Sequence, residues 1–425
     1  MVDVLLLILV LLVAQVLFKT LNRIELALQP SFMFALTLAI LILPSAFASR
    51  NMQSPTWGNA VQMHLLLAIL GTCFFGFGAY VASSRILPQK KQAGVTDRDR
   101  PRIWRGVARR CILLTCISIV ARLLLVKYAP PPGVLWTGLP VYILQFARLS
   151  HITIPVAWAL YILRVSRMPI ALNSFNYIVF AHGILISGKR FEALTAIAVT
   201  LIPFMAIRGY RPKRAFLIAM IPAMFLIVTL FPVLRVYTRE RDFQSVGTVK
   251  VWEEIETYLS GKKTNEFYEN TSDLAAVHFD GGANWGRGFY NMFVKFYVPG
   301  SIVGQEFKES LKADAVSLAS LRKNNNSGVH RFYIARNGFV ESFIEFRWYS
   351  PILFAVLGFL FQELYRFAIV ERRGVFILCY PVVLIVVSFV VYNGPPATLA
   401  RFLLNGVALG WMTFPVVGEV IAPPK

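Results

Sequence analysis

Charged residues are scarce in this chain. Only 15% of its 425 residues are Asp, Glu, Lys or Arg, while 56% are hydrophobic and the mean hydropathy is +0.60. Soluble globular proteins carry about 25% charged residues, so this composition excludes that class. Apolar runs of roughly 17 to 25 residues, each long enough to cross the hydrocarbon core of a bilayer as a helix, recur along the chain. The sequence therefore predicts an all-α polytopic membrane protein.

Signals for metals and cofactors are also missing. The four cysteines all lie inside apolar runs, where a small core residue is their ordinary role. No His/Cys cluster indicates a zinc site, and no Gly-rich P-loop indicates a nucleotide. Asp97 and Asp99 have the D-x-D spacing of metal-dependent nucleotide-sugar enzymes, but they stand among Arg and Lys, which favours a solvated loop. We expect no metal, no cofactor and no nucleic-acid partner.

Hydropathy predicts about eleven transmembrane helices. The first has neither the basic start nor the small-residue cleavage site of a signal peptide, so we expect it to be a span. The predicted spans are Val2–Phe18, Ser31–Ala48, Val61–Ser83, Gly106–Val126, Leu139–Leu163, Pro169–Ile186, Phe191–Ile207, Ala215–Leu234, Tyr349–Phe367, Gly374–Tyr392 and Thr398–Val417.

The distribution of basic residues predicts the topology. The connection from Arg85 to Arg105, extended by Arg109 and Arg110, holds nine basic residues, and the connection from Arg208 to Arg214 holds four. Such connections are cytoplasmic under the positive-inside rule. Alternation of the spans then places the N-terminus outside the cytoplasm and the C-terminus inside it.

One long polar segment, residues 235–348, interrupts the apolar runs. Of the 22 acidic residues, 14 lie between Arg235 and Tyr349. The topology makes this segment a large loop on the outer face, between residues 1–234, with spans one to eight, and residues 349–425, with spans nine to eleven. Within the loop, aromatic residues at helical spacing predict an interfacial helix over Trp285–Gly304, ended by Pro299 and Gly300. We expect a single membrane domain.

Several basic residues lie on the outer side, against the usual bias, and are candidates for binding an anion. Lys189 and Arg190 follow Gly188 at the start of a predicted span, where free backbone N–H groups also favour a phosphate. Arg148 lies nine residues into its span, about 14 Å deep at 1.5 Å per residue. The structural alternatives are a helix anchor for the pair and a carbonyl or carboxylate partner for Arg148. For Arg50, Lys127 and Arg122, snorkelling to the interface is a sufficient explanation.

The stretch His330–Arg347 holds the candidates for acid–base chemistry. Glu341 and Glu345 share a helical face, and either could accept a proton from a sugar hydroxyl, as could His330. Ordinary salt bridges within the loop are the structural alternative. The cations of this region and of the outer face complete the set of candidates for binding an anionic substrate: Arg287, Arg331, Arg336, Arg347 and Arg401.

The layout resembles the O-antigen polymerase family of oligosaccharide repeat-unit polymerases. The resemblance is carried by the turn Ser187-Gly188-Lys189-Arg190 between two mid-chain spans, by the late loop Arg235 to Arg347, and by Asn337-Gly338-Phe339-Val340-Glu341 before the return span. It implies a GT-C-like glycosyltransferase of the bacterial inner membrane. Such an enzyme transfers a glycan from undecaprenyl pyrophosphate to a hydroxyl of a second lipid-linked repeat unit, building O-antigen, capsule or exopolysaccharide.

The resemblance also implies the partners. These are the undecaprenyl-pyrophosphate-linked donor and acceptor and the membrane lipids, with a chain-length regulator as a further candidate. Two alternatives stay open: an O-antigen ligase, which shares the donor and uses lipid A core as acceptor, and a lipid-linked-glycan flippase. Transporters tend to show paired repeats and helices broken at corresponding positions, and the sequence indicates neither.

Overall fold

The structure is a computed structural model, and it describes most of the chain. The described residues are 1–50, 58–84, 100–128, 138–187, 190–209, 266–280, 282–314 and 336–416, with positions 211, 213–215, 218–219 and 256. Every regular element within these ranges is a helix, and none is a strand. The all-α prediction is therefore confirmed for the described part of the chain.

The helices follow the predicted spans closely. The first group is α1 (Val2–Asn22), η1 (Ile24–Leu28), α2 (Pro30–Thr37), the π-helical η2 (Leu38–Ile42), α3 (Leu43–Ser49) and α4 (Gly58–Ser83). The second is α5 (Arg100–Tyr128), α6 (Leu139–Ala147), α7 (Ser150–Ile162), α8 (Met168–Ser187) and α9 (Arg190–Arg208). The third is α12 (Glu266–Asp280), α13 (Arg287–Tyr297), α14 (Gly300–Val303), α15 (Gln305–Ser310) and α17 (Gly338–Phe346). The last is η4 (Arg347–Tyr349), α18 (Ser350–Tyr365), the π-helical η5 (Arg366–Val370), α19 (Gly374–Asn393), α20 (Pro395–Thr413) and η6 (Phe414–Val416).

Seven helices of the described part are long and apolar enough to cross a membrane. They are Val2–Asn22, Pro30–Ser49, Asn59–Ser83, Leu139–Ile162, Gly338–Val370, Gly374–Asn393 and Pro395–Val416. Helices α5, α8 and α9 occupy three further predicted spans. The predicted span Ala215–Leu234 lies largely outside the described residues.

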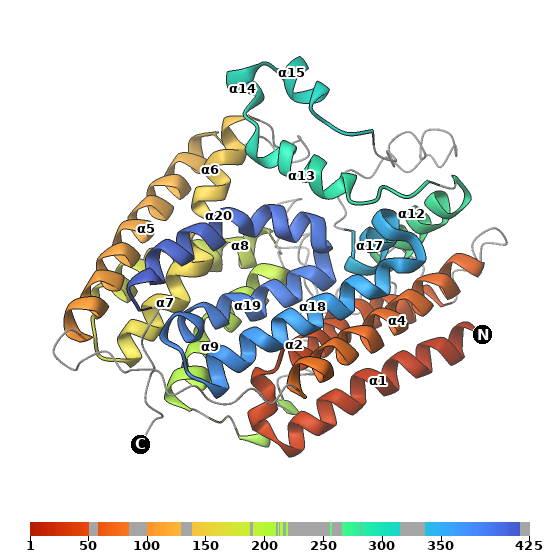
Figure 1. Ribbon diagram of the computed structural model, residues 1–425, viewed down its shortest axis with the longest axis horizontal. Helices are drawn as coiled ribbons and strands as arrows, with labels where there is room; N and C mark the ends of the chain where they lie inside the picture. The colour runs from red at the N-terminus through yellow and green to blue at the C-terminus, as the bar shows by residue number, and fades with distance from the viewer. Residues whose placement is uncertain are drawn as a thin grey trace.

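Among the described helices, α4 and α18 share the most extensive contact (Figure 1). A Cβ atom on Gly78 would lie 1.9 Å from the carbonyl oxygen of Ala355, and one on Gly358 would lie 2.1 Å from that of Phe75. Each helix thus presents a glycine to the backbone of the other. In lipid, where apolar burial drives association weakly, such close approach is what lets helices pack. Aromatic rings continue the contact, with the ring centroids of Phe75 on α4 and Phe361 on α18 6.4 Å apart.

The fifth predicted span differs from expectation because its helix is broken at Arg148 and Leu149. In a continuous helix the carbonyl of Ala147 would accept the amide of His151. Instead it accepts the hydroxyls of Ser118 at 2.9 Å and Ser150 at 3.1 Å, while the His151 amide donates to the Arg148 carbonyl. Two hydroxyl groups therefore supply the hydrogen bonds that the Ala147 carbonyl loses at the break, and one of them, from Ser118, belongs to a different helix, α5. The predicted span Leu139–Leu163 is therefore present as the candidate span Leu139–Ile162, and the interruption within it was not predicted.

Connections that are rich in basic residues meet at one end of the bundle. Arg211 pairs with Glu25 at 3.0 Å, and Arg214 donates to the carbonyl of Asn22. Arg372 donates to the carbonyls of Ala206 and Ile207 at the end of α9. These contacts join the connections after α1, α9 and η5, which the charge distribution assigned to the same side.

The opposite end carries the described part of the polar segment. In Figure 1, helices α12 to α15 lie at the end where α4 and α18 begin, and α13 crosses α20. Helix α13 lies within the predicted stretch and ends at Tyr297, just before Pro299 and Gly300, where the sequence predicted its end. Its flank stays exposed, with Tyr290 47% and Phe293 44% accessible. An amphipathic helix lying across the bundle end is what the aromatic spacing predicted.

Candidate functional site

Helix α17 is held in place by a buried hydrogen-bond network. The Asn337 side chain caps it by accepting the amide of Val340. Its amide nitrogen, which can only donate, lies 2.8 Å from Nε2 of His64, so His64 accepts there and donates from Nδ1 to the Thr271 hydroxyl. The Asn337 backbone amide donates to Asn270. Three segments far apart in sequence thus fix the start of the helix that carries both candidate carboxylates.

Glu341 is buried against the corner between α19 and α20. The corner residue Gly394 has a φ of +78°, and a Cβ there would lie 1.7 Å from Oε2 of Glu341. Helix α20 starts with Pro395 and Pro396, which have no N–H group, so Ala397 offers the first amide, and it donates to the Glu341 carboxylate. Among the described residues, Oε2 has no hydrogen-bond partner. Glu341 therefore lies at a helix N-terminus with one oxygen available.

Both carboxylate oxygens of Glu345, one turn further along α17, accept hydrogen bonds. Its Oε1 accepts the side-chain amide of Asn284 at 3.2 Å, and its Oε2 accepts the backbone amide of Gly288 at 3.0 Å. Gly288 is the second residue of α13, so the carboxylate also interacts favourably with the positive end of that helix dipole. Glu345 thus attaches α13 to α17. The two carboxylates predicted on one helical face lie on that face but have different surroundings.

Cations surround the Glu341 carboxylate. Arg336 and Arg401 both attract it, and Arg336 also pairs with Asp273 at 3.5 Å. Nε of Arg401 is buried without a hydrogen-bond partner among the described residues. On α13, desolvation lowers the pKa of Lys295, and Arg401 is the first of the neighbouring cations that lower it further. The positive charges of α13, α20 and the start of α17 therefore converge.

A second cluster of polar side chains lies where α6 and α7 meet. Arg122 of α5 donates to the Ser150 hydroxyl at 2.6 Å, and Arg122 and Arg148 both act electrostatically on His151. Snorkelling was the expected explanation for Arg122, but its guanidinium points to a buried serine. Arg148 also acts on Tyr297 at the end of α13, which connects this group to the one around Glu341. Arg148 and Arg401 are thus brought to the same region from different helices.

Tyr297 links α13 to α20. Its hydroxyl donates to the carbonyl of Ala400 at 2.7 Å and accepts the amide of Leu404 at 3.1 Å. These two groups are an i, i+4 pair, so the hydroxyl inserts into the hydrogen-bond ladder of α20. Arg401 directly follows Ala400, and its place is therefore set in part by α13.

Buried polar atoms without partners recur on the helices around these groups. Within the described ranges they include the hydroxyl of Tyr142, both amide atoms of Gln145, Nδ2 of Asn393 and Oδ1 of Asn405. Native proteins pair nearly all such atoms, and exceptions call for an explanation such as a bound polar molecule. Helices α6, α19 and α20 thus hold hydrogen-bonding capacity that the described protein groups do not use.

Other predicted cations lie apart or outside the described residues. Arg287 is exposed and donates to the carbonyl of Asp314, whereas Arg347 donates to the carbonyls of Val277 and Gly282. These contacts favour structural roles for both. His330, Arg331 and Lys189 lie outside the described residues, as does the side chain of Arg190. The backbone does place Arg190 at the first position of α9, after α8 ends at Ser187.

Within the described residues, no group of three or more His, Cys, Asp and Glu side chains could hold a metal ion. Compared with known protein families, with curated proteins and with solved structures, the chain matches none.

Sequence reasoning missed several residues that build the site. Gly394, Ser118 and His64 act through partners that are distant in sequence, as does Ser150 through Arg122. The Gly394-Pro395-Pro396 sequence did carry a usable signal, because a glycine before a proline pair marks a sharp corner whose following helix lacks its first amide donors.

Proposed function

We propose that this protein is a membrane glycosyltransferase that polymerises undecaprenyl-pyrophosphate-linked oligosaccharide repeat units at the periplasmic face of the bacterial inner membrane. The observation that carries the proposal is the buried Glu341 carboxylate, which keeps one oxygen without a partner among the described residues beside Arg401. Such a carboxylate can accept a proton, and the neighbouring cations can hold an anionic leaving group. The product is O-antigen, capsule or exopolysaccharide.

The proposed topology has eleven spans, with the site at the outer end. The basic connections meet at the other end of the bundle, as cytoplasmic connections would. Residues 235–348 then form a periplasmic loop, and α13 lies at the outer interface with Tyr290 and Phe293 exposed toward the lipid. These aromatic side chains suit contact with a prenyl chain. The N-terminus is periplasmic and the C-terminus cytoplasmic.

In the proposed reaction Glu341 is the general base. Its Oε2 takes the proton of an acceptor hydroxyl, and the freed oxygen pair attacks C1 of the donor sugar. The bond between C1 and the pyrophosphate oxygen breaks, and that oxygen keeps the electron pair. Arg401, with Arg148 and Arg336 from neighbouring elements, offsets the new charge on the leaving group. Arg190 at the start of α9 and Lys189 before it are further candidates for holding the pyrophosphate.

Glu345, Arg287 and Arg347 have supporting roles in this proposal. Each contacts backbone or side-chain groups in the described part of the loop. They position α13 and α17, and through them Tyr297 and Glu341. His330 and Arg331 remain candidates from the sequence, with His330 as the alternative base.

One observation favours a second function, a lipid-linked-glycan flippase. Discontinuous helices near polar groups are common in transporters, and the α6–α7 break with Arg148 is such a feature. A ligase that transfers the glycan to lipid A core would use the same donor and the same chemistry. The acceptor and the cellular phenotype separate these functions.

The test is the glycan profile of a strain that lacks this protein. Core capped by a single repeat unit is expected for a polymerase, whereas uncapped core indicates a ligase or a flippase and contradicts the proposal. Complementation with Glu341→Gln should leave the single-repeat profile unchanged. Glu306→Gln, which alters an exposed carboxylate of α15, should restore the polymer and serves as the matched control.

A further inference from the structure

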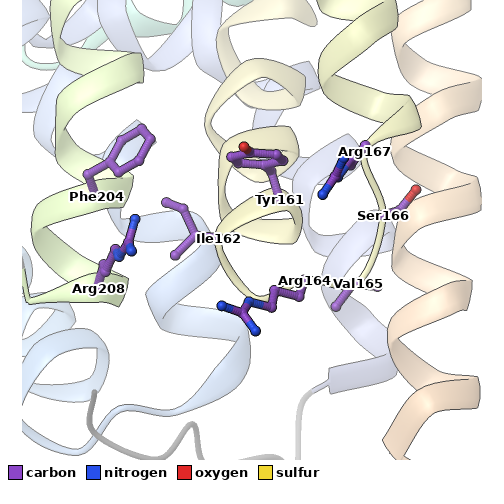
Figure 2. Close-up of a pocket in the computed structure, with 8 residues that line it drawn as sticks. All are labelled: Tyr161, Ile162, Arg164, Val165, Ser166, Arg167, Phe204 and Arg208. Atoms are coloured by element: carbon purple, nitrogen blue, oxygen red, sulfur yellow. The ribbon is translucent and has the colours of Figure 1, made fainter. Parts of the chain in front are cut away.

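A pocket of about 710 Å³ lies at the basic end of the bundle, away from the proposed active site. The end of α7, the connection to α8 and the end of α9 line it. Figure 2 shows Phe204 and Arg208 of α9 beside Tyr161 and Ile162 of α7, with Arg164 and Arg167 on the connection. Three of its eight lining residues are arginines, and none is acidic.

These three arginines differ from their neighbours at the same end. Arg211 pairs with Glu25, and Arg366 and Arg373 pair with Glu371. Arg164, Arg167 and Arg208 form no ion pair with any described residue, and their side chains are exposed. Their charges are therefore concentrated around one cavity and are not neutralised by the described protein groups.

The walls of the pocket suit a ligand with an apolar part. Tyr161 is 41% exposed, and Trp158 packs against both Tyr161 and Phe204, with ring centroids 5.8 Å and 5.0 Å apart. Aromatic side chains beside cations are typical of the zone where lipid headgroups meet acyl chains. The N-terminus of the 20-residue helix α8 borders the pocket and adds its positive dipole.

We propose that this pocket binds a phosphate group. Guanidinium groups match phosphate oxygens in charge and in geometry, and basic pockets between membrane helices bind anionic lipid headgroups. The phosphate can come from an anionic phospholipid of the surrounding leaflet or from a soluble phosphate compound. This site is separate from the one around Glu341, and it stands whether or not the protein is a glycosyltransferase.

The test uses the purified full-length protein in detergent. Native mass spectrometry with added cardiolipin is the lipid arm, phosphatidylcholine is the uncharged-headgroup comparison, and calorimetry with inorganic pyrophosphate is the soluble arm. The triple variant Arg164→Gln/Arg167→Gln/Arg208→Gln should weaken phosphate binding roughly 100-fold. Loss in the cardiolipin arm identifies a lipid site, and loss in the pyrophosphate arm alone identifies a soluble ligand.

A matched control removes the same number of charges from the same end but outside the pocket. Arg102→Gln/Arg109→Gln/Lys213→Gln alters three exposed cations and should leave binding within about twofold of the unmodified protein. If the triple pocket variant folds poorly, Arg208→Gln alone should still weaken binding several-fold. Equal binding by the pocket variants and the unmodified protein, or equal loss in the control, would overturn the proposal.

Discussion

Glu341 and Glu345 have the same chemistry but different hydrogen bonding. Both are buried on α17, and each lies at the N-terminus of another helix, α20 for Glu341 and α13 for Glu345. Both oxygens of Glu345 accept hydrogen bonds, so a proton there would displace a donor. Glu341 keeps Oε2 free of described partners and can take up a proton without breaking a bond.

This difference predicts how the two Glu→Gln variants behave. Glu341→Gln should lower the rate on the order of 100- to 10,000-fold, as loss of a general base does, and should still bind the lipid-linked substrate. Glu345→Gln should retain more activity. It should lower the free energy of unfolding by about 1–3 kcal/mol, because its new NH₂ group faces a donor.

The measurements are polymerisation of purified lipid-linked repeat units, substrate binding, and thermal unfolding in detergent. Wild-type turnover in Glu341→Gln would exclude this residue as the base and shift the assignment to His330.

Gly394 offers a second test of the same site. Ala at this position places a methyl group where the Glu341 carboxylate lies and forces a side chain into the φ of +78°. We expect Gly394→Ala to cost about 1–3 kcal/mol of stability and most of the activity. Gly406→Ala on the same helix α20 has no atom within 4 Å and should be neutral or slightly stabilising. Full activity in Gly394→Ala would argue against a role for this corner.

At the scale of elements, α13 and α20 behave as one unit. Tyr297 inserts its hydroxyl into the α20 ladder beside Arg401, and Glu345 fixes the other end of α13. Because α13 is fastened at both ends, it can hold Arg401 of α20 in position. Lipid contact along the exposed flank of α13 would then bear on the position of Arg401.

Tyr297→Phe tests this coupling. Removal of the hydroxyl should cost about 1 kcal/mol and lower turnover several-fold, with a smaller effect on protein level. Tyr290→Phe is the control, because its ring is 47% exposed on the same helix. Hydrogen exchange of the α20 amides near Leu404 is the readout specific to the coupling. An unchanged exchange rate in Tyr297→Phe would show that the insertion does not hold the helix.

The sequence predicted elements better than contacts. Hydropathy located the described spans because a lipid-crossing helix needs about 20 apolar residues, and that requirement is local. The break at Arg148 escaped prediction because Ser118, from another helix, satisfies the Ala147 carbonyl. Glu341 was identified from its position before a span, but its free oxygen depends on the Gly394 corner. The roles of Glu345 and Arg347 likewise depend on partners more than 50 residues away.

At the scale of the whole molecule, charge separates the two ends of the bundle. One end carries Arg211, Arg214 and Arg372 in contact with neighbouring connections, and the other carries α12 to α15. The proposed orientation follows from this asymmetry through the positive-inside rule.

Reporter fusions test the orientation. A fusion after Gln92 should report the cytoplasm, and one after Asn270 or the exposed Asp314 should report the periplasm. Asp314 is the better site for an inserted tag, because Asn270 is buried and accepts the Asn337 amide. The reverse pattern at either end would invalidate the placement of the site on the outer face.

The paired glycines of α4 and α18 also bear on how the chain is made. Gly358 emerges from the ribosome about 280 residues after Gly78, which at 5–20 residues per second is a delay of roughly 15–60 s. During that interval α4 is already synthesised, while the backbone surface that its glycines contact does not yet exist. A chain halted before residue 350 should therefore leave α4 open to other small-residue helices or to quality-control proteases. Quality-control factors that recognise incomplete membrane proteins would then be expected to bind α4.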